Sequence, residues 1–123
     1  MATDYFQRKL DDKRRLTIPA ELRIEFASGV VVTRGFGRYL HLYAKDVWDQ
    51  MVEPALRGDI LDESIGDKNV RLRMGKIEAS LDLKQGRFTL ESHLLDHANI
   101  SKEVVAVRAG QYWRLMPVES AEL

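Results

Sequence analysis

The fold of this chain is decided by one stretch near its beginning, Leu10-Asp11-Asp12-Lys13-Arg14-Arg15-Leu16-Thr17-Ile18-Pro19. Its four polar residues, Asp11–Arg14, separate two segments of strand-like composition, Tyr5–Leu10 and Arg15–Ile18. Such a pattern predicts a β-hairpin that turns at the polar residues. Pro19 suits the first turn of a helix, where its missing N–H costs nothing. We therefore expect a short helix over residues 20–27 directly after the hairpin.

The same pattern recurs about 72 residues later in the chain. Three pairs of segments correspond in the same order: Arg15–Leu22 with Arg87–Leu94, Val31–Arg34 with Val105–Arg108, and Tyr39–Leu42 with Tyr112–Leu115. Each unit, about residues 8–53 and 80–118, predicts the element order ββαββ. A unit of this size buries too little surface to fold alone, so the two are expected to share one core. The predicted fold class is mainly β with short helices.

Helical signals fill the segment between the two units. Apolar residues spaced three to four apart over Val47–Leu56 predict an amphipathic helix, which Pro54 should kink or divide. Its apolar face, with Trp48 and Met51, either completes the core or contacts a neighbouring molecule, and the core is the more common fate. An acidic loop is expected over residues 58–66, and Asp67 is the expected cap of a second helix. The predicted division is residues 1–57 for the first unit with its following helix, 58–76 for a linker with a short helix, and 77–123 for the second unit.

Composition excludes several classes of protein. The chain has 123 residues, no cysteine, and 19 basic residues against 19 acidic ones. Without cysteine there is no disulfide and no thiolate nucleophile, which fits a cytoplasmic protein. The N-terminus lacks a signal-peptide pattern, and no apolar run is long enough to cross a membrane. Because net charge is zero, attraction to a polyanion depends on local placement, and residues 8–15 hold five basic residues and two acidic ones.

The evidence for an enzyme is weak. His93 and His97 stand four apart on a predicted helix, a spacing that can hold a metal. The zinc-protease pattern, however, requires Glu directly after the first histidine, and this chain has Leu94. Gly35-Phe36-Gly37 is an isolated turn signal and no phosphate-binding loop. We expect no enzymatic activity, no metal or other cofactor, and no small-molecule substrate.

The stretch Leu10–Pro19, followed by Glu21-Leu22-Arg23, resembles the signature of the AbrB-type swapped-hairpin DNA-binding fold. Two tandem copies, joined by an insert that ends in Leu72-Arg73-Met74-Gly75, are similar to the MraZ family of bacterial transcription regulators. The resemblance covers nearly the whole chain. It implies that the two units form an intramolecular swapped-hairpin β-barrel. It also implies an operator-contacting Asp-x-x-x-Arg motif, which falls here on Asp11 and Arg15.

The resemblance implies a set of DNA-contacting residues. Arg15, Arg14 and Lys13 are the first candidates, Arg8, Lys9 and Arg23 are expected backbone clamps, and Lys84 and Arg87 are the candidates in the second copy. Asp11 is expected to accept hydrogen bonds from the turn and to orient Arg15. Composition alone equally allows a solvated hairpin tip with internal ion pairs.

The two copies depart from the family pattern in different ways. Arg14 stands where the family usually has Gly, so the turn either adopts another geometry or gains a cation at its tip. In the second copy Leu83 occupies the expected Asp position, with Asp82 shifted by one. Glu91-Ser92 replaces the proline-containing start of the helix. Equal function of the two copies is therefore not expected.

For partners, the resemblance implies double-stranded DNA and other copies of the same chain. A ring-like homo-oligomer would bind direct repeats in a promoter, upstream of a cell division and cell wall gene cluster, in the nucleoid. One alternative is an AbrB-like or MazE-like repressor or antitoxin, disfavoured because the sequence ends at Leu123 without a long acidic tail. The other is an oligomeric scaffold that no longer binds DNA.

Overall fold

A computed structural model describes residues 3–121, so both ends of the chain discussed above lie partly outside the described residues. In chain order the elements are β1 (Tyr5–Lys9), β2 (Arg15–Thr17), η1 (Ala20–Phe26), β3 (Val30–Arg34), β4 (Leu40–Ala44), α1 (Lys45–Val47), η2 (Trp48–Val52), α2 (Glu53–Ala55), α3 (Glu63–Arg73), β5 (Ile77–Ala79), β6 (Arg87–Thr89), α4 (Ser92–Ala98), β7 (Glu103–Arg108), β8 (Trp113–Pro117) and η3 (Val118–Ala121). The predicted fold class, mainly β with short helices, is confirmed. The order ββαββ occurs twice, with a 3₁₀-helix, η1, as the first helix and α4 as the second.

The strands of the two repeats are interleaved. One sheet has the order β1-β7-β8-β4-β3-β5, and a separate two-stranded ribbon is made by β2 and β6. The predicted hairpin between β1 and β2 is wrong as a pairing, because β1 pairs along its whole length with β7 and β2 pairs with β6. The predicted barrel is also not closed: no ladder joins the ribbon to the six-stranded sheet within residues 3–121.

The strand registers relate the two repeats by an approximate two-fold axis. In the ribbon, Leu16 lies opposite Phe88, its own counterpart at the repeat offset of 72. Between β4 and β8, His41 lies opposite Arg114, its counterpart at the offset of 73. Self-pairing of equivalent residues is the mark of an isologous two-fold interface, here within one chain.

The main core is built from both repeats. The inward residues Leu16 and Phe88 of the ribbon pack in one cluster with Phe26, Leu94 and Trp113, all buried. Burying a large apolar side chain stabilises a fold by about 1.5–3 kcal/mol. Because each repeat supplies part of this cluster, the core forms only when both are present, as expected from their size.

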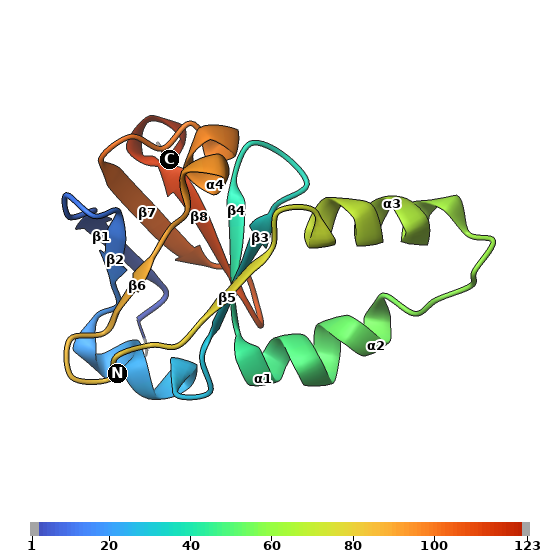
Figure 1. Cartoon of the computed structure of the whole chain (residues 1–123), viewed down its shortest axis with the longest axis horizontal. Coiled ribbons are helices and arrows are strands. Elements are labelled where there is room, and N and C mark those ends of the chain that lie inside the picture. The colour runs from blue at the N-terminus through green and yellow to red at the C-terminus, as the bar shows by residue number, and fades with distance from the viewer. Residues whose placement is uncertain (1–2, 122–123) are drawn as a thin grey trace.

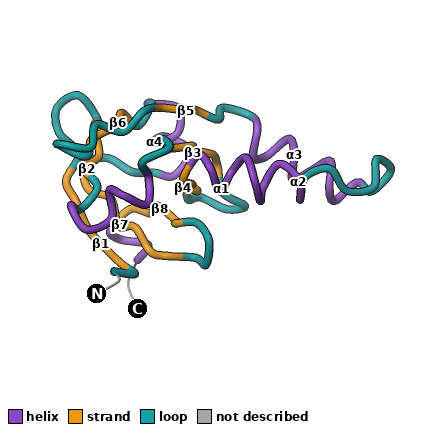
Figure 2. Tube along the Cα trace, turned by 90° about the horizontal axis from the view of Figure 1, so that it is seen from below, coloured by secondary structure: helices purple, strands orange, loops and turns teal. Residues whose placement is uncertain are grey.

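A helical arm, residues 45–73, extends from one side of the sheet (Figures 1 and 2). Its first limb runs without interruption through α1, η2 and α2, and it changes from π-helical to α-helical at Glu53, next to Pro54. Pro54 thus does not divide the limb as predicted, and only the helix type changes beside it. Trp48 and Leu56 are buried in a second, smaller apolar cluster, whereas Met51 is 49% exposed, so only part of the predicted apolar face joins a core.

The second limb of the arm, α3, begins five residues earlier than predicted. Asp62, and not Asp67, caps it: Asp62 Oδ1 accepts hydrogen bonds from the Ser64 N–H (3.0 Å) and from the Ser64 hydroxyl (2.8 Å). Asp67 lies within the helix. The Asp62–Ser64 pair gives the earlier position two hydrogen bonds, which outweighs the loop-like composition of the segment.

Candidate nucleic-acid interface

The two-stranded ribbon carries the candidate interface on its outer face. Leu16 and Phe88 point to the core, so their neighbours Arg15, Thr17, Arg87 and Thr89 share the opposite face and are half-buried. Each arginine lies opposite a threonine of the other strand. The two threonines are not among the predicted site residues, although the alternation Arg-Leu-Thr and Arg-Phe-Thr places each of them on the face of its arginine.

Asp11 organises this face. Its Oδ1 accepts hydrogen bonds from the backbone N–H groups of Lys13 (2.9 Å) and Arg15 (2.8 Å), and its Oδ2 accepts one from Arg15 Nε (2.6 Å). The prediction that Asp11 accepts hydrogen bonds from the turn and orients Arg15 is confirmed. Arg87 Nη1 of the second repeat lies 4.0 Å from the same Oδ2. The Arg15 backbone N–H foremost, together with the Arg15 side chain, lowers the pKa of Asp11, which stays ionised.

The geometry around Asp11 leaves donors free on Arg15. Within residues 3–121 its side chain donates only through Nε, to Asp11, so both Nη nitrogens remain available. These two nitrogens form the fork that binds two acceptors at once. The Arg15 guanidinium is therefore fixed through Nε, while its two Nη nitrogens are free to bind a ligand.

The loop of the second repeat is built differently. Three residues separate Asp11 from Arg15, but four separate Asp82 from Arg87. Asp82 Oδ1 accepts a hydrogen bond from the Lys84 N–H (3.0 Å), and the Gly86 N–H donates to the Asp82 carbonyl. Arg87 instead contacts Gln85 and Asp11. The second loop thus has no equivalent of the Asp11–Arg15 pair.

Arg23, an expected DNA clamp, is engaged with the backbone of this second loop. Its Nε donates to the Ile18 carbonyl (3.0 Å) and its Nη1 to the Lys84 carbonyl (2.9 Å). A Cβ added to Gly86 would come within 2.2 Å of Arg23 Nε, so glycine is required at this contact. Arg23 ties the segment after β2 to the second loop, a role that its sequence position did not reveal.

Arg14 keeps the backbone conformation that favours glycine. Its φ is +59°, and its counterpart at the repeat offset of 72, Gly86, has a φ of +66°. Of the two alternatives from the sequence, the turn retains this geometry and gains a cation at its exposed tip. A non-glycine residue in this region costs about 1–2 kcal/mol.

Replacing Arg14 by glycine should therefore stabilise the protein. Relief of the strain, less the added freedom of glycine in the unfolded chain, gives a gain of about 0.5–1 kcal/mol in the free energy of unfolding. Urea denaturation measures it, with Arg14→Ala as the matched control, because alanine removes the charge but keeps the strain. Equal stability of the two variants would contradict the strain.

The other predicted cations surround the ribbon without neutralising partners. Arg8 and Lys9 on β1, Lys13 in the first loop and Lys84 in the second are exposed. Within residues 3–121, none of these four side chains lies within 4.0 Å of a carboxylate oxygen. Both loops lie on the side of the molecule away from the helical arm (Figure 1).

The two histidines with metal-like spacing are engaged elsewhere. His93 Nε2 lies 2.8 Å from the Gly75 carbonyl oxygen, and His97 Nε2 lies 2.9 Å from that of Gly37. Across residues 3–121, no cluster of three or more His, Asp or Glu side chains is arranged to hold a metal ion. No helix of the described chain is long and apolar enough to span a membrane.

These features define a class: a chain of two interlocked ββαββ repeats with an approximate two-fold axis, a cationic ribbon on one side and a helical arm on the other. Comparison with known proteins agrees with this description. Residues 1–60 match the family described as "MraZ protein, putative antitoxin-like". The chain belongs to the MraZ family.

Three relatives are each named Transcriptional regulator MraZ. The protein of Cutibacterium acnes is 34% identical over 101 residues, which cover 82% of this chain and 70% of the relative. That of Oenococcus oeni is 33% identical over 122 residues, covering 95% and 81%. That of Syntrophomonas wolfei is 35% identical over 106 residues, covering 85% and 73%.

Proposed function

We propose that this chain is a DNA-binding transcriptional regulator whose reading surface is the outer face of the β2–β6 ribbon. The observation that carries the proposal is the pair of arginines, Arg15 and Arg87, placed on one face beside a single carboxylate, Asp11. The major groove of B-DNA admits a two-stranded β-ribbon. The names of the relatives, transcriptional regulators, support the same function.

The proposed contacts divide into two kinds. The free Nη fork of Arg15 suits guanine, whose O6 and N7 accept two hydrogen bonds from arginine, and the methyl groups of Thr17 and Thr89 suit contact with thymine. The exposed cations around the ribbon are Arg8, Lys9, Lys13, Arg14 and Lys84, and these bind phosphates and set the register of the ribbon in the groove. Arg23 serves the reading surface indirectly, by fixing the second loop.

The two loops make this surface asymmetric in spite of the approximate two-fold axis. Arg15 is bound to Asp11 at 2.6 Å, whereas Arg87 lies 4.0 Å away, and the second loop is one residue longer. An asymmetric surface prefers a non-palindromic box. Boxes repeated in one direction, each bound by one subunit of a ring-like homo-oligomer, fit such a surface, and linked contacts raise the overall affinity.

The proposed targets are promoter direct repeats upstream of a cell division and cell wall gene cluster, read by a cytoplasmic protein in the nucleoid. Selection of bound duplexes from a random pool tests this. We expect enrichment of short G-containing boxes in direct repeat. Their affinity should fall steeply with salt, since each phosphate contact adds about −0.9 to the slope of log K against log salt concentration. No enrichment, or a flat salt dependence, would refute the proposal.

One alternative has a specific observation in its favour, the antitoxin-like wording of the family description. An antitoxin binds a toxin partner as well as DNA. Affinity purification of the tagged protein from its own cells separates the two functions. A small basic protein recovered in equal amount would favour the antitoxin, and recovery of the chain alone with promoter DNA would favour the regulator.

A further inference from the structure

The tip of the helical arm, residues 59–63, exposes two adjacent large apolar side chains. Ile60 is 95% exposed and Leu61 is 90% exposed, which makes them the most exposed large apolar residues in the described chain. Acidic residues flank them, Asp59 on one side and Asp62 and Glu63 on the other. An exposed apolar group with a charged rim is the usual appearance of a protein-contact site.

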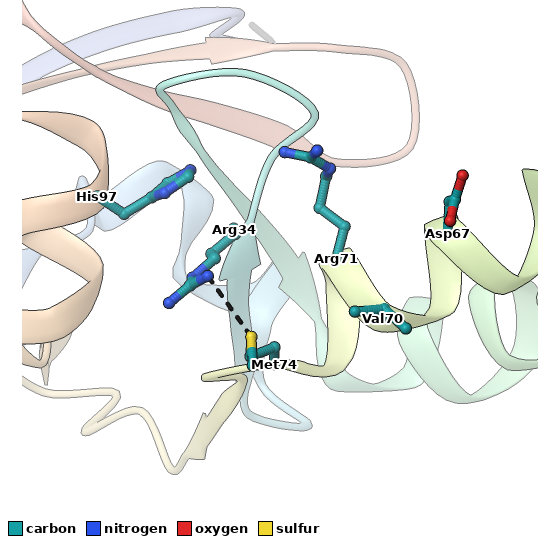
Figure 3. Close-up of a pocket in the computed structure, with 6 residues that line it drawn as sticks. All are labelled: Arg34, Asp67, Val70, Arg71, Met74 and His97. Atoms are coloured by element: carbon teal, nitrogen blue, oxygen red, sulfur yellow. Dashed lines mark hydrogen bonds between the residues drawn. The ribbon is translucent and has the colours of Figure 1, made fainter.

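A pocket of complementary character lies at the base of the same arm (Figure 3). Its volume is about 440 Å³, and it is lined by Arg34, Asp67, Val70, Arg71, Met74 and His97. Val70 and Met74 are 63% and 59% exposed, so the pocket offers an uncovered apolar surface. Two arginines against one carboxylate make the pocket cationic.

Arg34 in particular lacks an acidic partner. Its Nε is buried and donates no hydrogen bond within residues 3–121, and its Nη1 donates only to the sulfur of Met74 (3.7 Å). No carboxylate oxygen of the described chain lies within 4.0 Å of Arg34 or Arg71. A partly buried guanidinium without a carboxylate is costly, so the pocket favours a ligand that brings one.

We propose that the arm tip of one copy of this chain binds the pocket at the base of the arm of the next copy. Ile60 and Leu61 cover Val70 and Met74, and the acidic residues of the tip meet Arg34 and Arg71. The inference rests on the proposed function in one respect only: it names the contact that would build the proposed homo-oligomer. The arm tip complements the pocket in both charge and apolar surface, and for this reason we assign a second copy of the chain as the occupant of the pocket.

A chain cannot fill its own pocket. The tip and the pocket lie at different ends of α3, a helix of 11 residues. The arm is also braced, because Arg73 donates two hydrogen bonds to the Glu53 carboxylate (2.7 and 3.0 Å) and the Asn69 side chain donates to the Leu56 carbonyl (2.9 Å). The tip therefore cannot fold back, and the occupant comes from another molecule.

A contact between two different surfaces is heterologous, and repeated contacts of this kind close into a ring or extend as a filament. Each subunit then gives one tip and receives one. The arm points away from the β2–β6 ribbon and its loops (Figure 1), so assembly through the arm leaves the proposed DNA surface of every subunit free.

Because the natural sequence has no cysteine, disulfide cross-linking tests this contact directly. We expect the double variant Leu61→Cys/Val70→Cys, treated with an oxidant, to give a ladder of covalent oligomers in a denaturing gel. Within one chain Val70 lies roughly 10 Å along α3 from Glu63, and Leu61 lies before the start of this helix. The two positions are therefore too far apart for a disulfide. The matched control Leu61→Cys/Ala27→Cys places the second cysteine on an exposed residue that does not line the pocket, and it should give no ladder. A ladder of equal strength in both, or in neither, would overturn the proposal.

A second measurement separates this proposal from the proposed function. The variant Ile60→Asp/Leu61→Asp changes only solvent-exposed side chains, so the subunit should stay folded, as circular dichroism would verify. We expect it to be a monomer by light scattering, to bind a single box as the wild type does, and to lose at least about 10-fold in affinity for repeated boxes. A variant that stays oligomeric would overturn the tip contact. If the variant is a monomer as expected but the wild type binds no DNA, only the proposed function is overturned.

Discussion

We expect Arg15→Ala to lower the affinity for the selected box by about 10- to 100-fold, the usual cost of losing a bidentate arginine–guanine contact. Binding to a scrambled duplex changes little, because that binding depends on phosphates. The expected effect of Arg87→Ala is smaller, since Arg87 lies 4.0 Å from Asp11 whereas Arg15 is bonded to it at 2.6 Å. Fluorescence-anisotropy titrations of both variants against both duplexes measure these differences.

The matched control for Arg15→Ala is Lys13→Ala. Lys13 is exposed at the tip of the same loop and has no carboxylate within 4.0 Å among the described residues. As a phosphate contact it should weaken binding to both duplexes alike and reduce the salt slope by about 1. If Arg15→Ala behaved like this control, Arg15 would be a phosphate contact and the ribbon would not read sequence.

The second large effect concerns His41 and the stability of the fold at low pH. His41 is 1% exposed on β4, its Nδ1 lies 2.8 Å from the Tyr43 hydroxyl, and its Nε2 has no partner among residues 3–121. Aromatic rings surround it: Phe36, Tyr39, Tyr43 and Tyr112. Burial first, and the charge of Arg114 second, lower the pKa of His41 to about 4.

Acid should therefore destabilise the protein through this one residue. Above the ordinary pKa of 6.5, His41 is neutral in both the folded and the unfolded chain, and it has no effect on the pH dependence. As the pH falls from 6.5 to about 4, the unfolded chain takes up a proton that the folded chain refuses. The free energy of unfolding then falls by about 3 kcal/mol, after which the effect levels off.

Urea denaturation at several pH values measures this loss, with His41→Asn as the comparison. Asparagine keeps an amide near the position of Nδ1 beside Tyr43 but does not titrate. The variant can differ in absolute stability, so the quantity to compare is the change between neutral and acidic pH. A wild type and a variant with the same acid dependence would contradict the assignment to His41.

The sequence predicted the fold well where its signals are repeated in the chain. The corresponding segments Arg15–Leu22 and Arg87–Leu94 gave two ββαββ units and a shared core, and both are found. A β1–β2 hairpin was predicted, whereas β1 pairs with β7. Turn residues indicate where the chain turns, but they do not indicate which strand each strand will pair with. The closed barrel was expected from the family resemblance alone, and no ladder joins the two sheets within residues 3–121.

In the candidate interface, a contact between residues close in the sequence was predicted, whereas contacts between distant residues were missed. Asp11 and Arg15 are four apart, so their contact was predictable from the sequence. The bond from Arg23 to the Lys84 carbonyl joins residues 61 apart, and the approach of Arg87 to Asp11 joins residues from different repeats. Such contacts depend on how the repeats interlock, which spacing along the chain does not encode. That these residues contact DNA stays a prediction.

The measurement that tests the central claim most directly is site-directed cleavage of DNA from the ribbon. The cysteine-free chain allows a single iron-chelate cleavage reagent at Thr89→Cys, on the outer face of the ribbon, or at Leu61→Cys, on the arm tip. The account predicts cuts within the selected boxes from position 89 and none from position 61. Cuts from position 61 alone would contradict it, because they would place the DNA on the arm.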